Sequence, residues 1–120
     1  MLADPQSVTP TGGSAVSLPA IGRSADSSVY QSADGNTKLT VSHAFGKRNR
    51  YQVRLDFSKI AADPLISAQN IKYSMSAYLV IDTPITGFTV AEAMAQTGGL
   101  LAYLSATTNA KVTSVLGGET

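Results

Sequence analysis

Polar and apolar side chains alternate in three stretches of this sequence, and the polar positions carry many of its basic residues. Residues 38–59 contain six basic side chains and one acidic side chain, Asp56, a net charge of +5. The other residues contain three basic and seven acidic side chains, a net charge of −4. Because side chains two positions apart on a strand share a face, the cations would gather on one side of a sheet and suit a polyanion. The alternating polar positions are Lys38, Thr40 and Ser42, then Arg50, Gln52, Arg54, Asp56 and Ser58, and then Lys72, Ser74, Ser76 and Tyr78.

The inventory of reactive side chains argues against an enzyme. One histidine, no cysteine and eight carboxylates leave few ways to pair a base with a nucleophile. His43 falls on the apolar side of its stretch, and we interpret it as a core or core-edge imidazole. The paired glycines at 12–13, 98–99 and 117–118 lack the lysine and the strand-to-helix context of a phosphate-binding loop. We therefore expect no catalytic site, no cofactor and no metal.

The length of 120 residues predicts a single domain with a modest core. No run of about 20 apolar residues could span a membrane, and the first five residues do not resemble a secretory signal, so we expect a soluble protein. The order of patterns predicts an α+β fold: a hairpin in residues 1–20, an antiparallel sheet of about five strands in 27–84 and a helical segment in 88–120.

The N-terminal hairpin should pair residues 6–9 with 15–18 through a turn at 10–13, where glycines tolerate positive φ. Residues 21–28 are interpreted as a polar connector before a short strand at 29–31. Residues 32–36 then form a turn into the first long strand.

Three long strands are predicted by apolar residues at every second position. The apolar sides are Leu39, Val41 and Phe45 in residues 38–45, then Tyr51, Val53, Leu55 and Phe57 in 50–58, and then Ile71, Tyr73, Met75, Ala77, Leu79 and Ile81 in 70–82. The turn at 46–49 is either an exposed polar tip or a ligand contact. The longer loop at 59–69 either contacts a partner or packs on its own sheet.

The periodicity becomes helical after residue 88. Thr89 and Glu92 are spaced as a capping box, and a helix from residue 90 to about 105 would carry one apolar stripe, weakened by Gly98 and Gly99. A second short helix at about 108–116 would be stopped by Gly117.

The third long strand would lie at the sheet edge, since sequential strands are usually neighbours. A long edge with an oily face is a template for association, and pairing with the same strand of a second copy satisfies both edges. We therefore predict an obligate homodimer.

With these elements in place, the sequence resembles the coat proteins of the single-stranded RNA bacteriophages, the levivirus-type family, over essentially its whole length. The resemblance rests on the hairpin, the strand segments 38–42 and 50–56, the long loop before the last strand, and a helical pair containing residues 93–96 and 100–101. It implies a dimer whose sheets join into one continuous sheet, with helices crossing the partner's outer face. It further implies an icosahedral shell, assembled in the cytoplasm of a bacterial host, whose inner face holds genomic RNA in the virion.

The resemblance also implies an RNA-binding site and translational repression through an RNA hairpin at the replicase start. Lys38, Thr40 and Ser42 match the family's RNA-facing lysine and the hydroxyl residues of its adenine pocket. Gln52 and Arg54 occupy the RNA-facing positions of the next strand, where Gln52 departs from the usual hydroxyl residue. Arg50, Lys72, Ser74, Ser76 and Tyr78 would share that face, with Tyr78 as the candidate for base stacking. Residues 59–69 would be the family's loop around the symmetry axes.

Two other interpretations stay open. The abundance of Ser, Thr and Gly is compatible with an extracellular or appendage-type β-rich binding module. A small enzyme built on an unfamiliar site is the other.

Overall fold

Seven strands precede one helix in the residues that the computed structural model describes, 2–66 and 68–120. The chain divides into two compact units, Met1–Asp82 and Thr83–Thr120, of which the first contains nearly all of the β structure and the second contains the helix. Within the described residues no helix is long and apolar enough to cross a membrane.

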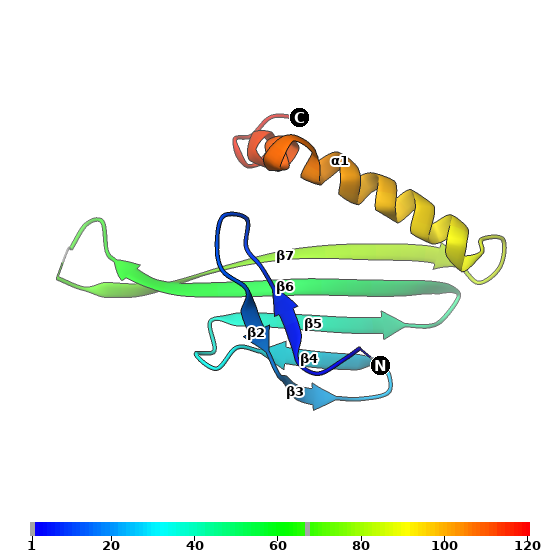
Figure 1. Ribbon diagram of the computed structural model, residues 1–120, viewed down its shortest axis with the longest axis horizontal. Coiled ribbons are helices and arrows are strands. Elements are labelled where there is room, and N and C mark those ends of the chain that lie inside the picture. The colour runs from blue at the N-terminus through cyan, green and yellow to red at the C-terminus, as the bar shows by residue number, and fades with distance from the viewer. Residues whose placement is uncertain (1, 67) are drawn as a thin grey trace. The chain divides into compact units, whose positions relative to one another are not determined.

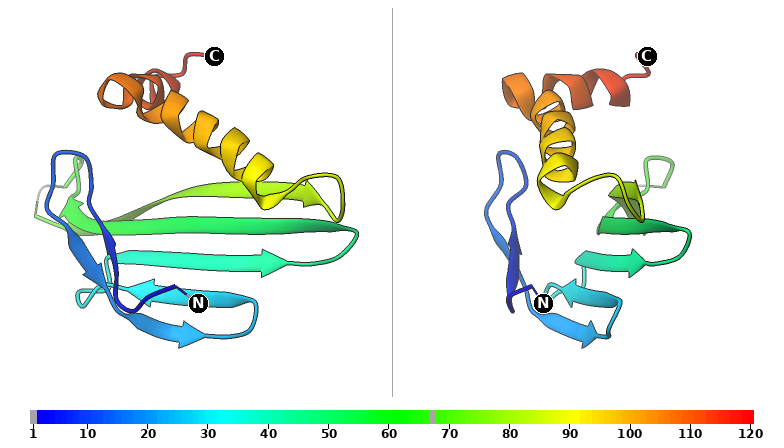
Figure 2. Two further views of the ribbon diagram at one scale, coloured as in Figure 1. Left: turned by 45° about the vertical axis from the view of Figure 1, so that its right-hand side comes forward. Right: turned by 90° about the vertical axis from the view of Figure 1, so that its right-hand side faces the viewer.

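The N-terminal hairpin forms as predicted. β1 (Gln6–Val8) pairs antiparallel with β2 (Val16–Leu18), and its turn is closed by the Gly13 amide, which donates to the Pro10 carbonyl at 2.9 Å. Gly12 has a φ of +80° in that turn, a conformation that glycine adopts without a steric penalty. β2 contacts the sheet at β5, and the hairpin lies on one side of the sheet (Figures 1 and 2).

The main sheet has five antiparallel strands in chain order, β3-β4-β5-β6-β7 (Figure 1). The strands are β3 (Ala20–Arg23), β4 (Ser27–Gln31), β5 (Thr37–Ala44), β6 (Arg48–Ala62) and β7 (Asn70–Pro84). The predicted connector at 21–28 is therefore wrong, because β3 and the start of β4 occupy most of it. The pairing of β3 with β4 shifts between Ala20 and Gly22, and this irregularity interrupts the alternation by which a strand is recognised.

The turn between β4 and β5 is held by side chains. The Ser32 hydroxyl lies against the Asp34 carboxylate, which also accepts from the Asn36 amide at 3.0 Å, while Ser32 accepts from the amide of Thr37 at 3.1 Å. The hydrogen bonds that the carboxylate accepts, first from the Ser32 hydroxyl and then from the Asn36 amide, lower the pKa of Asp34 below its ordinary value. The predicted turn at 32–36 is confirmed, with Gly35 at a φ of +76°.

β6 and β7 are longer than the alternation predicted. β6 continues to Ala62, so the predicted loop at 59–69 is wrong over its first four residues. The remaining connection, 63–69, begins with Asp63, whose amide donates to the Gln69 carbonyl at 2.8 Å and whose carboxylate accepts from the Leu65 amide at 2.8 Å. Ser67 lies outside the described residues.

Complete burial is rare in this chain. Of the described apolar side chains only Leu18 and Tyr30 are fully buried. Tyr30 is opposite Leu39 in the register of β4 and β5, and the Arg23 guanidinium lies 5.6 Å from the centroid of its ring. The densest packing of the first unit is therefore at the end of the sheet formed by the early strands.

The second unit contains α1 (Val90–Leu116), which begins at the predicted N-cap: Thr89 accepts from the Glu92 amide at 3.1 Å. At the other end the Gly117 amide donates to the Thr113 and Ser114 carbonyls, and Gly118 follows with a φ of +91°. α1 is interrupted at 106–109, where the backbone leaves the helical conformation: Thr107, Thr108 and Asn109 have φ values of 55°, 55° and 61°. Two helical stretches, 90–105 and 110–116, therefore meet at a kink within α1. The glycine pair at 98–99 lies within the helix, and none of the described helical residues is buried.

Candidate nucleic-acid interface

The register of β5 and β6 gathers the predicted polar residues on one face of the sheet. Lys38 is opposite Asp56, Thr40 is opposite Arg54, Ser42 is opposite Gln52, and Ala44 is opposite Arg50. Opposite residues in an antiparallel pair project to the same side, so these residues form one surface, here called the polar face. The intervening pairs, Leu39 with Leu55 and Val41 with Val53, project to the other side, the apolar face.

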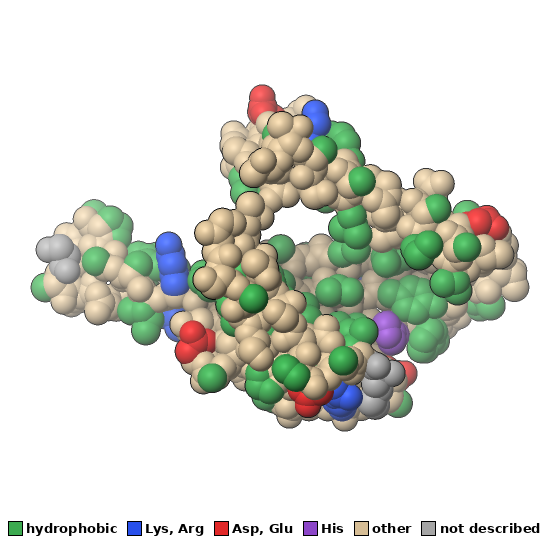
Figure 3. Space-filling view, in the orientation of Figure 1, with side chains coloured by type: hydrophobic (Ala, Val, Ile, Leu, Met, Phe, Trp, Pro, Cys, Tyr) green, Lys and Arg blue, Asp and Glu red, His purple; other side chains and the backbone are tan. Residues whose placement is uncertain are grey.

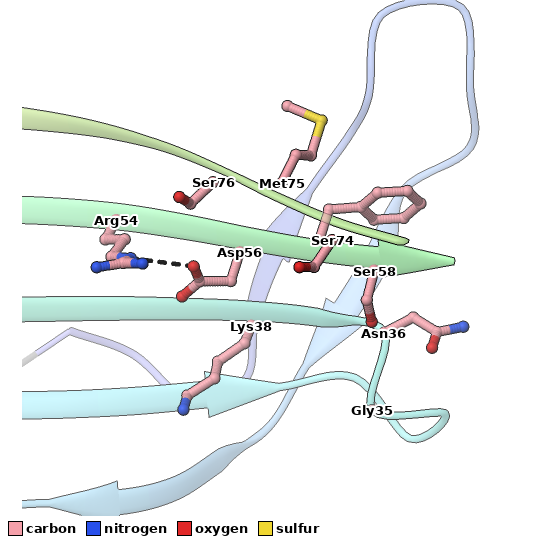
Figure 4. A pocket seen from close by; sticks show the side chains of 10 residues that line it. Gly35, Asn36, Lys38, Arg54, Asp56, Ser58, Ser74, Met75 and Ser76 are labelled. Carbon is pink, nitrogen blue, oxygen red and sulfur yellow. Dashed lines mark hydrogen bonds and ion pairs between the residues drawn. The ribbon is translucent and has the colours of Figure 1, made fainter. Parts of the chain in front are cut away.

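β7 adds its predicted polar residues to the same surface. The Arg54 guanidinium carbon lies 5.6 Å from the centroid of the Tyr78 ring. Ser74 and Ser76 line a hollow together with Lys38 and Arg54, and Figure 4 shows their hydroxyls beside the Arg54 and Asp56 side chains. Lys72 is two residues before Ser74 on the same strand and shares its side by alternation. The ten residues chosen from the sequence therefore lie on three neighbouring strands, β5, β6 and β7.

Carboxylates moderate the positive charge of the polar face. The Nε atoms of Arg48 and Arg54 lie 3.0 Å from carboxylate oxygens of Asp82 and Asp56, respectively. Both pairs are half exposed, so each contributes little to stability. Their main effect is to reduce the positive electrostatic potential of the polar face, because two of its arginines are already paired with carboxylates.

Sequence reasoning missed two residues of this surface, Arg48 and Asp82. Arg48 falls in the predicted turn at 46–49, and Asp82 is 34 positions away from its arginine partner along the chain. Asp56 and Ser58 fall on the polar side of their strand in the sequence pattern but are not among the predicted binding residues, although both line the hollow. Alternation continued backward from residue 50 to 48 would have included Arg48.

The apolar face carries large side chains that the chain itself leaves uncovered. The exposed fractions of Phe45, Val53, Phe57 and Met75 are 61%, 41%, 42% and 60%. Figure 3 shows apolar side chains gathered beside the hairpin on the visible side of the sheet. His43 lies on this side of the sheet as predicted, with its ring centroid 5.2 Å from that of Tyr51 and 6.1 Å from that of Phe45. It is exposed rather than part of a core, because this end of the apolar face is uncovered.

The described residues include no group of three or more His, Cys, Asp or Glu side chains that could hold a metal ion. The candidate site consists instead of cations, hydroxyls, amides and one tyrosine ring on a strand surface. Such groups can neutralise phosphates and read the edges of unpaired bases.

Comparison with known proteins identifies the fold. No protein-family model matches the sequence, and no curated protein matches it either. Among solved structures, the virus-like particle of bacteriophage AVE019 superposes with a TM-score of 0.77 over 89% of this chain and 90% of that chain, at 11% identity. The capsid protein of bacteriophage GA gives 0.67 over 98% and 95%, at 12% identity. The virus-like particle of Beihai levi-like virus 21 gives 0.69 over 97% and 94%, at 11% identity.

The chain therefore has the coat-protein fold of RNA bacteriophages, as its sequence predicted. The hairpin, the five-stranded antiparallel sheet and the C-terminal helix are the elements that were expected. At this level of identity the likeness establishes the fold, and the role of the chain has to be argued from its own surfaces.

Proposed function

We propose that this chain is a structural capsid protein that pairs as a homodimer, self-assembles into a closed icosahedral shell and holds single-stranded genomic RNA against the polar face. The observation that carries the proposal is the two-sided sheet, which has one charged face and one large uncovered apolar face within a coat-protein fold. The role is structural rather than enzymatic. It places the chain in a virion that is assembled in the cytoplasm of a bacterial host.

The open edge of the sheet supports pairing. β7 ends the strand order and is 15 residues long, whereas β3 at the opposite edge has four residues. A long unpaired edge exposes a row of backbone donors and acceptors that another strand can satisfy. Two copies of β7 related by a two-fold axis would complete both edges and join the sheets into one.

Exposed apolar surface supports the same pairing. Complete burial of one large apolar side chain is worth roughly 1.5 to 3 kcal/mol, so covering the half-exposed Phe45, Val53, Phe57 and Met75 would contribute about 3 to 6 kcal/mol. This is comparable with the ~5 to 15 kcal/mol of net stability of an ordinary domain. In α1, Val90, Met94, Leu101 and Leu116 are also exposed, and the predicted crossing of helices over the partner's sheet would cover both surfaces.

The polar face is the proposed RNA surface. Lys38, Arg50, Arg54 and Lys72 would neutralise phosphates, and the hydroxyl and amide groups of Thr40, Ser42, Gln52, Ser74 and Ser76 would contact unpaired bases. Tyr78 supplies a ring for stacking. A dimer would present this set twice and could hold an RNA hairpin, which is the basis for repression of translation. The loop at 63–69, with the exposed Leu65 and Ile66, would contact neighbouring dimers.

The decisive experiment is to purify the full chain from a bacterial expression host. The capsid role predicts particles of uniform diameter by electron microscopy that absorb strongly at 260 nm because they enclose RNA. A small discrete species free of nucleic acid would contradict the proposal, and it would favour a binding module instead.

The dimer is tested separately by changing one face of β7 at a time. Met75→Asp places a charge on the uncovered apolar face and should prevent both pairing and particle formation. Ser76→Asp makes a similar change on the adjacent residue of the polar face and should leave the dimer intact. Analytical ultracentrifugation of both variants at high salt measures the outcome, and a dimeric Met75→Asp variant would reject the pairing surface.

A further inference from the structure

One hollow of the polar face differs in chemistry from the rest of the surface. It has a volume of about 240 Å³, and its polar lining consists of Lys38 of β5, Arg54, Asp56 and Ser58 of β6, and Ser74 and Ser76 of β7 (Figure 4). Gly35 and Asn36 of the preceding turn and the apolar Phe57 and Met75 complete the lining. Pockets for drug-sized ligands usually exceed about 300 Å³, so this hollow suits a single planar ring system rather than a longer ligand.

The carboxylate in the hollow restricts the ligand. Asp56 is held by Arg54, whose Nε atom lies 3.0 Å from one of its oxygens, and Figure 4 shows the carboxylate beside the hydroxyl groups of the lining serines. A carboxylate accepts hydrogen bonds and repels phosphate. The ligand that fits here therefore presents N–H donors to Asp56, even though the polar face as a whole attracts anions.

A flexible donor lies on the neighbouring strand. Lys38 is opposite Asp56 in the register of β5 and β6 and lines the same hollow. Figure 4 shows its ammonium group extended away from the carboxylate, so it would turn toward the hollow when a ligand binds. A matching ligand has adjacent N–H donors for the carboxylate and an acceptor beside them for the ammonium group. Among the four RNA bases only guanine has two adjacent donors on its Watson–Crick edge, N1–H and the N2 amino group, with the O6 acceptor next to N1.

We propose that this hollow binds one unpaired guanine, with Asp56 accepting from N1–H and N2–H and Lys38 donating to O6. The inference rests on the proposed RNA-binding function of the polar face and adds a base preference to it. Asp56 is then a specificity-determining residue. It weakens general attraction for phosphate and strengthens binding of one base.

The test measures the affinity of the full chain, freed of host RNA at high salt, for labelled single-stranded oligouridines that carry one central substitution. The probes contain guanosine, adenosine, inosine or no substitution, and binding is followed by fluorescence anisotropy. The guanosine probe should bind roughly five-fold tighter than the adenosine probe or better, which is the lower bound for a bidentate base contact. Inosine lacks the N2 amino group, so the affinity of its probe should lie between those of the guanosine and adenosine probes.

Two matched variants locate the preference. Asp56→Asn should abolish the guanosine preference and tighten binding of plain oligouridine, because an anion is removed while the side chain keeps its size. Asp82→Asn removes the other paired carboxylate outside the hollow, and it should tighten binding of all four probes while keeping the guanosine preference. Asp56→Glu keeps the charge at a greater reach and should retain part of the preference, which guards against a variant that fails to fold.

The outcomes separate the two proposals. Salt-dependent binding of every probe with equal affinity would overturn the guanine pocket and leave the RNA-binding face standing. A guanosine preference that survives in Asp56→Asn would overturn the assignment to this hollow. Absence of binding to any probe would overturn both.

Discussion

The guanidinium carbon of Arg54 lies 5.6 Å from the centroid of the Tyr78 ring, which links β6 to β7 on the polar face. An exposed cation over an aromatic ring contributes about 0.5 to 1 kcal/mol. The same guanidinium donates to Asp56, so one arginine is oriented from two directions. A side chain held in this way has less conformational freedom to lose when a ligand binds.

Removing a cation from the polar face should weaken RNA binding. For Arg54→Ala and Lys38→Ala we expect lower affinity for single-stranded RNA and a weaker dependence of that affinity on salt. On a double-logarithmic plot the slope should fall by about 0.7 for each phosphate that is no longer neutralised. Titrations at several salt concentrations measure both quantities. Lys59→Ala is the matched control, because residue 59 alternates to the other side of β6.

Unchanged affinity and salt slope in both variants would show that RNA does not contact this face. An equal weakening in Lys59→Ala would instead indicate that only the net charge of the chain matters.

Bulky substitutions at the hydroxyl positions should separate hairpin recognition from general binding. Thr40 is opposite Arg54 and Ser42 is opposite Gln52 in the β5–β6 register, and a large side chain such as in Thr40→Phe would block a base while leaving the cations in place. We expect a larger decrease in affinity for an RNA hairpin selected against the native chain than for unstructured RNA. Competition binding of the two RNAs gives the ratio directly, and equal decreases would argue against a base pocket there.

The parts of the fold that could be predicted follow from local alternation along the sequence. The parts that could not be predicted depend on contacts between distant segments. Period-two alternation identified β5, β6 and most of β7, and the opposed pairs of β5 and β6 follow from a short turn between them. Alternation did not identify β3, where the register shifts near Gly22. It also did not identify residues 59–62, which continue β6 after the clear alternation of apolar and polar side chains has ended. The hollow could not be predicted, since it requires Ser74 and Ser76 to come beside Asp56 from the next strand, across a long connection. The two salt bridges of the polar face depend on side-chain orientation, which alternation does not specify.

The kink in α1 is expected to be strained. Thr107 and Thr108 are β-branched residues at φ values of 55°, where a side chain costs about 1 to 2 kcal/mol relative to an ordinary helix. Thr108→Gly should therefore stabilise the protein by up to about 1 kcal/mol. Ala102→Gly, in the regular part of the helix, should destabilise it by about 1 kcal/mol.

Chemical unfolding at equal protein concentration measures both changes. Changes of the same sign in the two variants would show that residue 108 does not need a left-handed conformation.

The turn at 32–36 should make a small contribution to acid sensitivity. The pKa of Asp34 is lowered in the folded chain, first by the hydrogen bond from the Ser32 hydroxyl and then by that from the Asn36 amide. A carboxylate whose pKa is lowered by folding stabilises the protein fully at any pH above its unfolded-state pKa. That stabilisation is lost as the pH falls through its folded-state pKa. The stability difference between the native chain and Asp34→Asn should thus be constant near neutral pH and shrink below about pH 4.

Denaturant titrations of both proteins from neutral to strongly acidic pH follow this difference. Asp63→Asn is a suitable comparison, since Asp63 also accepts from a backbone amide two residues on but has no serine hydroxyl partner among the described hydrogen bonds. A pH-independent difference would mean that the Asp34 carboxylate keeps its ordinary pKa.

Among the described apolar residues only Leu18 and Tyr30 are fully buried. The stability of a newly made chain should therefore depend on the concentration of other copies. If the chain associates as proposed, mass action would stabilise it, so a dilute chain would open often and be cleaved by proteases, while a chain at high concentration would persist. The amount of folded protein should then rise abruptly once the rate of synthesis exceeds the rate of degradation. On the proposed capsid role, shell assembly would then begin only when enough subunits are present to complete a shell.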